Sequence, residues 1–173
     1  PSPQPSAAPQ APPANSTAAG NSSAPAASMV RSAVAGPVEM SWTPPAENEA
    51  DLLMTLTFGG TGWFSFGIGQ GMADADILMM RFTNGNGEIV DTKSSGYVMP
   101  AADGSQDATI VSATEEGGKT TITFQRALDT GDGDDKVINR GDKALPVMFA
   151  WSTTSDAFGF HGQDYTMGKI DLF

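Results

Sequence analysis

The chain has 173 residues, and its 20 acidic side chains outnumber its 9 lysines and arginines, which gives a formal net charge of −11. This excess of negative charge disfavours binding to nucleic acid or to an anionic membrane surface. Because the sequence contains no cysteine, disulfides, thiolate nucleophiles, iron–sulfur clusters, blue-copper sites and covalently attached c-type haem are excluded. No run of about eighteen apolar residues is present, so we expect no membrane insertion.

Residues 1–28 form a segment of low complexity. This segment contains only Pro, Ala, Ser, Asn, Gln, Thr and Gly, and such a composition cannot bury enough apolar surface to fold. We predict a tail or linker here, followed by one folded domain over residues 29–173. Asn15 and Asn21 each begin an N-glycosylation sequon, which indicates a secreted glycoprotein, extracellular or periplasmic. No signal region opens the sequence, so if a signal peptide existed, we expect it to have been removed.

Alternating apolar residues predict strands in the rest of the chain. Period-two patterns at 38–42, 52–58 and 64–68 indicate the first three strands. A hairpin follows, because the apolar run 77–82 is joined to 88–92 by Asn-Gly-Asn-Gly, residues that tolerate positive φ. Further strands are predicted at 96–99, 108–114, 119–126, 146–151 and 169–173, with a tight connection at 115–118.

The spacing of these strands indicates the fold class. No window keeps a helical period over about ten residues, so no helices are available to connect parallel strands. Short strands separated by Gly-rich turns favour an antiparallel sandwich or barrel. We therefore predict an all-β protein.

His161 is the only histidine in the sequence, and this limits the possible sites. A metal site that needs two imidazoles is excluded within one chain, as is bis-histidine haem ligation. A Ser-His-Asp hydrolase is disfavoured because no Gly-x-Ser-x-Gly motif is present and Ser65 lies in the middle of a predicted strand. Taken alone, His161 is either a hydrogen-bonded structural residue or a single imidazole ligand.

Met72 differs from most of the nine methionines by its setting. Six methionines fall in predicted strands, where filling the core is the simplest role: Met40, Met54, Met79, Met80, Met99 and Met148. Met72 instead lies on a Gly-rich loop directly after the aromatic strand at 64–68. A thioether in that position can reach a soft metal, although spacing alone leaves a packing role open.

The acidic run at 129–135 invites a calcium interpretation, since calcium prefers hard oxygen ligands. The EF-hand spacing fails, because Lys143 stands where the twelfth position of a loop beginning at Asp132 requires a bidentate Glu. We interpret the run as a solvated acidic turn. The Gly-rich stretch at 67–71 resembles a phosphate loop only loosely and lacks the following Lys.

Four segments together resemble the DOMON domain, in the branch of the cytochrome domain of cellobiose dehydrogenase. They are Gly-Trp-Phe-Ser-Phe-Gly-Ile-Gly at 62–69, Met-x-x-Ala-Asp at 72–76, Phe-x-Arg-x-Leu-x-Thr-Gly-Asp at 124–132 and Phe-His-Gly at 160–162. The resemblance extends over about residues 36–173. It implies a two-sheet antiparallel β-sandwich, immunoglobulin-like in architecture, with a haem pocket at one end.

The resemblance also implies the cofactor and its ligands. Non-covalent haem b (iron protoporphyrin IX) would be ligated by Met72 and His161, and a thioether–imidazole pair leaves the iron without an open position. The resemblance further implies that the pocket wall or the adjacent core contains Trp63, Phe64, Phe66 and Ile68. Tyr97 would bond a haem propionate and Arg126 would pair with a carboxylate, although plain core or surface roles are the competing interpretation for all six residues.

The function implied is that of an extracellular b-type cytochrome, a non-enzymatic electron-transfer protein that exchanges single electrons with redox protein partners. One alternative is a haem-free DOMON module that binds sugar or another surface ligand. A second alternative is a structural subunit of an extracellular assembly, in which residues 1–28 pack on a neighbouring copy to form a homo-oligomer or filament.

Overall fold

The computed structural model describes residues 30–173, so the predicted tail, its two sequons and Met29 lie outside the described residues. Within 30–173 the regular structure is entirely strand. The strands are β1 (Arg31–Ala35), β2 (Val38–Thr43), β3 (Asp51–Phe58), β4 (Phe64–Ile68), β5 (Ala73–Thr83), β6 (Asn86–Ser95), β7 (Ala101–Ala102), β8 (Ala108–Glu116), β9 (Lys119–Ala127), β10 (Leu145–Trp151) and β11 (Tyr165–Ile170). Nothing in this part of the chain forms a helix that could cross a membrane.

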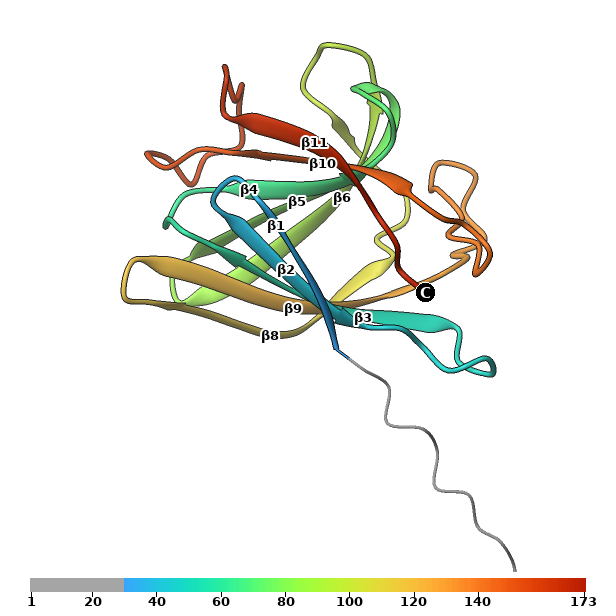
Figure 1. Cartoon of the computed structure of the whole chain (residues 1–173). Helices are drawn as coiled ribbons and strands as arrows, with labels where there is room; N and C mark the ends of the chain where they lie inside the picture. The colour runs from blue at the N-terminus through green and yellow to red at the C-terminus, as the bar shows by residue number, and fades with distance from the viewer. Residues whose placement is uncertain (1–29) are drawn as a thin grey trace, which may run out of the picture.

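The strands form two antiparallel sheets packed face to face (Figure 1). One sheet has the order β1-β2-β3-β9-β8, and the other has the order β11-β10-β4-β5-β6-β7. The predicted all-β, two-sheet antiparallel sandwich is confirmed. β4 and β10 are antiparallel neighbours although they are far apart in sequence, so the loops that follow them leave from opposite ends of the pair.

The core between the sheets follows the period-two pattern. In β2, Val38, Met40 and Trp42 are buried, while the residues between them are more exposed. In β3 the buried positions are Leu52, Met54, Leu56 and Phe58. The Trp42 Nε1 donates a hydrogen bond to the Leu172 carbonyl oxygen at 3.1 Å, which ties the C-terminal segment to this core.

β4 is buried on both of its faces, and this feature positions the site. Phe64, Phe66 and Ile68 belong to the core between the sheets, so the alternate residues Ser65 and Gly67 face the other way. A second apolar cluster covers that outward face, and it consists of Trp63, Ala75, Ile77, Met79 and Met148. The six-stranded sheet therefore carries apolar side chains on both sides, and its outer side must be covered by loops.

Two predicted turns are confirmed. β5 and β6 are joined by Asn84 and Gly85 with φ of 53° and 79°, the positive values that a type I′ hairpin turn requires. β8 and β9 are joined by Gly117 and Gly118 with φ of 59° and 78°. Glycine or asparagine at these four positions explains why local sequence was sufficient to locate both hairpins.

Three strand predictions need correction. β1 was not predicted, since its short side chains show little alternation and its pairing with β2 depends on the backbone. Residues 96–99 form a loop and not a strand, because the Val98 amide bonds back to the Gly96 carbonyl at 2.9 Å and turns the chain. The last strand runs over Tyr165–Ile170 instead of 169–173, since its register with β10 begins at Tyr165.

Candidate functional site

A cavity of about 650 Å³ lies against the outward face of the six-stranded sheet. Its floor comes from three adjacent strands: Ser65 on β4, Ile77 on β5, and Met148 and Ala150 on β10. Its walls come from three loops and from β11: Gln70, Gly71, Met72, Tyr97, Val98, Met99, Pro100, Phe158, Gly159, Phe160, His161, Gly162, Gln163, Tyr165 and Met167. Ligand and cofactor pockets commonly have volumes of roughly 300–1,000 Å³ and mainly apolar linings, and this cavity has both properties.

Gly67 allows the floor of the cavity to close. It pairs with Met148 on one side and Ile77 on the other. A Cβ at this position would lie 2.8 Å from Met148 Cγ and 3.1 Å from Ile77 Cγ1. The missing side chain lets these two apolar residues meet over β4, which makes a continuous apolar surface beneath the cavity.

The loop between β10 and β11, residues 152–164, is held in place by backbone contacts with the segment that precedes β4. The Trp63 amide donates to the Ser155 carbonyl at 3.0 Å, and the Ser152 amide donates to the Trp63 carbonyl at 2.9 Å. Gly62 packs directly under this loop, because a Cβ built there would lie 2.0 Å from the Ser152 oxygen and 2.8 Å from the Ser155 oxygen. Gly62 and Trp63 belong to the motif at 62–69, and their role in the structure is to hold this loop against the start of β4.

Aromatic contacts position the same loop further along the chain. The Phe158 ring lies 6.3 Å from the Trp63 ring in an edge-on arrangement. The Arg81 guanidinium lies 4.4 Å from the centre of the Phe158 ring, and its Nη1 donates to the Asp156 carbonyl at 3.2 Å. These contacts with β5 and with the start of β4 fix the part of the loop that leads to His161.

Met72 and His161 line the same cavity, although they come from different loops. Met72 follows β4 and packs against the outward cluster, while His161 lies in the loop that follows β10. Because β4 and β10 are antiparallel, the two loops start at opposite ends of this strand pair, and residues of both line the same cavity. Met99, Met148 and Met167 line the cavity as well, so it contains more than one thioether.

The surroundings of His161 do not match those of a hydrogen-bonded structural histidine. Its Nδ1 is buried and has no hydrogen-bond partner among the described residues. Its ring centre lies 5.2 Å from that of Tyr165 and 5.4 Å from that of Phe160. A buried nitrogen without a hydrogen-bond partner is costly. Aromatic packing without such a partner therefore favours an imidazole that binds a ligand over one that has only a structural role.

The mouth of the cavity exposes an unusual amount of apolar surface. Tyr97 is 94% exposed and Phe160 is 90% exposed, and Val98, Met99, Tyr165 and Met167 are about half exposed or more. These residues come from two loops and from β11, yet all of them line one cavity. Apolar groups gathered around one opening mark a site that a ligand or partner covers.

We expected Phe64, Phe66 and Ile68 in the pocket wall or in the adjacent core, and the structure places them in the core. All three face the core between the sheets and none lines the cavity, because alternation along β4 turns Ser65 and Gly67 outward instead. Trp63 supports the cavity through Phe158 without lining it. Tyr97 does line the cavity, and its side chain is almost fully exposed.

Met148 and Met79 are buried, as the sequence predicted, and both belong to the outward cluster. Met148 also lies in the cavity floor, and only Met99 needs reassignment. Met99 is 50% exposed in the loop after Gly96, at the cavity mouth. Period-two counting from Val147 and Phe149, both core residues, would have placed Met148 on the outer face.

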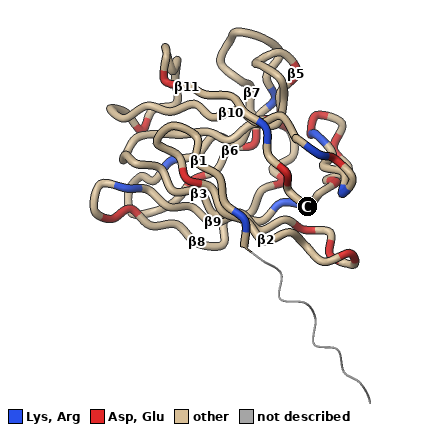
Figure 2. The backbone as a smooth tube through the Cα atoms, viewed as in Figure 1, with Lys and Arg blue, Asp and Glu red and all other residues tan. Residues whose placement is uncertain are grey.

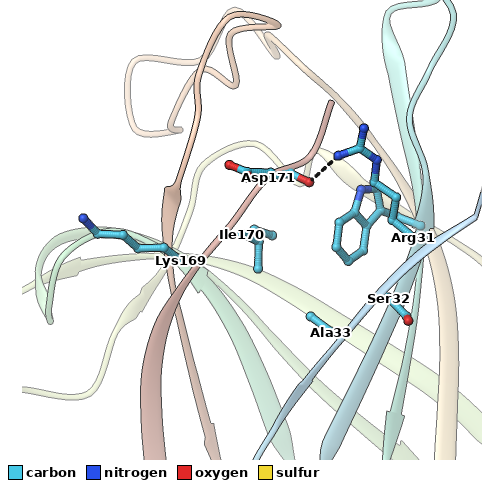
Figure 3. A pocket seen from close by; sticks show the side chains of 7 residues that line it. Arg31, Ser32, Ala33, Lys169, Ile170 and Asp171 are labelled. Atoms are coloured by element: carbon cyan, nitrogen blue, oxygen red, sulfur yellow. Dashed lines mark hydrogen bonds between the residues drawn. The ribbon is translucent and has the colours of Figure 1, made fainter.

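A second, more open hollow of about 510 Å³ lies near the C-terminus, and it contains none of the predicted site residues. It is lined by Arg31, Ser32, Ala33, Trp42, Lys169, Ile170 and Asp171. Figure 3 shows Arg31 from β1 reaching the Asp171 backbone, where Nη1 donates to the carbonyl oxygen at 3.1 Å, while Lys169 extends away. We interpret this hollow as a structural junction between β1 and the C-terminal segment.

A family comparison identifies the chain's relatives. The DOMON domain family matches residues 35–152, a range that includes Gly62, Trp63 and the Met72 loop. The chain belongs to the DOMON family. His161 lies beyond the matched range, in the loop that completes the cavity of this DOMON domain.

Two solved structures share the DOMON fold of this chain. The cytochrome domain of cellobiose dehydrogenase from Myriococcum thermophilum matches with a TM-score of 0.62 at 10% identity, covering 81% of this chain and 80% of that domain. The cytochrome b domain of pyranose dehydrogenase from Coprinopsis cinerea matches with a TM-score of 0.64 at 11% identity, covering 78% and 76%. At these identities the similarity is one of fold, and it confirms the predicted resemblance.

Proposed function

We propose that this DOMON domain is a b-type cytochrome that carries single electrons by means of haem b held non-covalently between Met72 and His161. The observation that carries the proposal is that both residues line one apolar cavity. The similarity to two cytochrome domains supports it. When bound, the haem would supply an iron that cycles between its ferrous and ferric states.

The residues of the cavity fit such a group. A neutral imidazole nitrogen and a thioether sulfur are established axial haem ligands, and together they leave no position for oxygen or substrate. Met148 and Ile77 offer an apolar floor, which excludes water and suits a largely apolar macrocycle. The absence of cysteine requires non-covalent binding, so the cofactor would be held by the two ligands and by apolar contact.

The chain's own residues would set the properties of the centre. A thioether ligand raises the reduction potential, and Met72 would have this effect. His161 would be held in orientation by the rings of Phe160 and Tyr165. The exposed rings of Tyr97 and Phe160 would lie at the edge of the bound group, where a redox protein partner would approach.

The test is the optical spectrum of protein produced with ample haem. We expect a red protein with a sharp Soret band and split α and β bands after reduction with dithionite. Met72→Leu and His161→Ala should each change the spectrum, with the greater loss for His161→Ala. Met99→Leu and Met167→Leu are the matched controls, because both residues line the cavity and neither is the proposed ligand. A colourless protein, or a spectrum that only the control substitutions change, would contradict the proposal.

The exposed aromatic side chains at the mouth favour one alternative, a haem-free DOMON module that binds sugar. Tyr97 and Phe160 present their rings to solvent, and such rings can stack on apolar sugar faces. This alternative predicts a colourless protein whose tyrosine fluorescence responds to an added oligosaccharide and loses that response in Tyr97→Ala. A red protein with the expected spectrum would exclude it.

We also propose that the protein functions outside the cytoplasm, in extracellular or periplasmic space. The two sequons at Asn15 and Asn21 support this location. In protein purified from its native source, treatment with an N-glycosidase should lower the apparent mass. An unchanged mass would remove the glycoprotein part of the proposal.

A further inference from the structure

Three aspartates from separate segments meet in the interior of the protein, away from the Met72–His161 cavity lining. Asp76 lies on β5, Asp91 on β6 and Asp135 in the loop between β9 and β10, and their carboxylate oxygens lie within 4.8 Å of one another. Asp76 is 3% exposed, Asp91 is 1% exposed and the side chain of Asp135 is 3% exposed. Carboxylates are rarely buried unless they are paired or bind a metal.

The protein satisfies only part of this cluster. Asp76 Oδ2 accepts hydrogen bonds from Arg126 Nη2 at 2.5 Å and from the Lys136 amide at 2.9 Å. Asp91 Oδ2 accepts a hydrogen bond from the Asp107 amide at 3.2 Å. Asp91 Oδ1 is fully shielded from solvent and has no partner among the described residues.

Asp135 is also incompletely satisfied. Its Oδ2 lies 3.3 Å from Arg126 Nη2, which makes an ion pair but not a well-aligned hydrogen bond. The expected pairing of Arg126 with a nearby carboxylate is confirmed, and it involves two carboxylates at once. Two buried carboxylate oxygens, one on Asp91 and one on Asp135, therefore lack hydrogen-bond donors.

The charges of the cluster do not balance. Three carboxylates against one guanidinium leave two negative charges in the interior when all groups are ionised. Lys136, which follows Asp135 in the sequence, and Lys93 on β6 form ion pairs outside the cluster, since Lys136 Nζ pairs with Asp74 at 2.6 Å and Lys93 pairs with Asp134. An excess of two buried negative charges is the charge that one divalent cation neutralises.

The donor set indicates which cation. All available ligand atoms are oxygens, which suit hard cations and not zinc or copper. Calcium takes six to eight oxygen ligands in a flexible geometry, whereas magnesium usually keeps several waters and binds through only one or two carboxylates. A buried group of three protein carboxylates therefore suits calcium better. We infer that Asp76, Asp91 and Asp135 form a calcium-binding site.

A neighbouring acidic group does not share these features. Asp103, Asp132 and Asp134 also lie close together, but they are more exposed, and Asp134 already pairs with Lys93. Figure 2 shows acidic and basic residues mixed in the loop between β9 and β10, from which Asp132 and Asp134 come. No fully buried oxygen without a partner occurs in this second group among the described residues, so we assign the site to the buried cluster alone.

The test is calcium binding by the full chain after treatment with a chelator. Isothermal titration with calcium chloride should give one ion per chain, and saturating calcium should raise the melting temperature by about 5–10 °C. Asp91→Asn and Asp135→Asn keep the side-chain shape and remove one charge each, and either change should weaken calcium binding at least about tenfold. Asp134→Asn and Glu116→Gln are matched controls, because both residues lie outside the buried cluster, and their calcium affinity should equal that of the unchanged chain.

Two outcomes would overturn the inference. The first is the absence of binding heat and of any thermal shift up to about 5 mM calcium, well above the dissociation constants of most structural sites. The second is unchanged affinity in Asp91→Asn. If these variants do not fold, crystals of the unchanged protein soaked in terbium chloride should show an anomalous peak among Asp76, Asp91 and Asp135; a peak elsewhere, or none, would contradict the assignment.

Discussion

Replacing Gly62 by alanine tests how the His161 loop is held. The new Cβ would lie 2.0 Å from the Ser152 carbonyl oxygen and 2.8 Å from the Ser155 oxygen, whereas ordinary carbon–oxygen contacts are about 3.3–3.6 Å. Both obstacles are backbone atoms, so the loop itself must withdraw by about 1 Å or more. That movement would break the two hydrogen bonds between Trp63 and this loop, at 2.9 and 3.0 Å.

The magnitude follows from these contacts. Overpacking costs about 1–3 kcal/mol, and each of the two lost hydrogen bonds costs about 1 kcal/mol, so we expect the free energy of unfolding to fall by about 3–5 kcal/mol. For a domain of this size, the melting temperature should fall by roughly 6–20 °C. Because the loop carries His161, the proposed haem should also bind more weakly. The assay is thermal unfolding followed by circular dichroism, together with a haem titration.

Gly104→Ala is the matched control for this experiment. A Cβ at Gly104 would meet no atom within 4 Å, so the control should change stability by no more than about 0.5 kcal/mol. Equal melting temperatures for Gly62→Ala and the unchanged protein would refute the conclusion that this close approach holds the loop. A lower melting temperature with unaltered haem affinity would show that the loop moves without displacing His161.

Three further predictions concern the buried charges and the tail. Burial raises the pKa of Asp91 to about 7, above its value in the unfolded chain, so between these two values the folded state holds a proton that the unfolded state has lost. Lowering the pH from about 8 to about 6 in the presence of a chelator should therefore raise the free energy of unfolding by about 1.4 kcal/mol through this group, as measured by urea unfolding. This part of the pH dependence should disappear in Asp91→Asn, and a persisting slope would assign it to other groups. Arg126→Gln should cost about 3–5 kcal/mol in the free energy of unfolding, because it leaves Asp76 and Asp135 without their cation, and a cost below about 1 kcal/mol would show that the pair is not maintained in solution. Light scattering of the full chain against a chain without residues 1–28 should show a smaller assembly for the shortened form if the tail joins copies into an oligomer or filament, and identical monomers would exclude that proposal.

Much of the sandwich could be predicted because its strands alternate clearly. Val38, Met40 and Trp42 form the buried face of β2, and spacing alone identifies them. The type I′ turn at Asn84-Gly85 was predictable for a local reason, since few other residues adopt two successive positive φ values. Strand β1 gives neither signal, and its position depends on pairing with β2.

The site was less predictable, because it depends on the face to which each residue turns. Alternation along β4 showed that Phe64 and Phe66 share a face, but it could not show which face turns to the core, because every position of this strand is buried. Met72 and His161 were singled out from their motifs, and their shared cavity depends on the long-range pairing of β4 with β10 and on loops that start at opposite ends of that pair. Local sequence patterns do not predict a pairing between strands so far apart in the chain.

The acidic run at 129–135 shows the same limit. Its spacing excluded an EF-hand and indicated a solvated turn, and most of its residues are at least partly exposed. The side chain of Asp135 is the exception, because it turns inward to Arg126. Its neighbours Asp76 and Asp91 come from two other strands, so a cluster assembled from three segments leaves no pattern in a linear sequence.

The double burial of β4 separates the molecule into two tiers that share a single layer of backbone. The tier between the sheets maintains the scaffold, while the outer tier is closed by loops that contribute little to that core. Loop residues can therefore change without dismantling the sandwich, and the contents of the outer tier can diverge among proteins with a common frame. Gly67 lies in the shared layer against side chains of the outer tier, so it is a position where scaffold and binding surface cannot evolve independently.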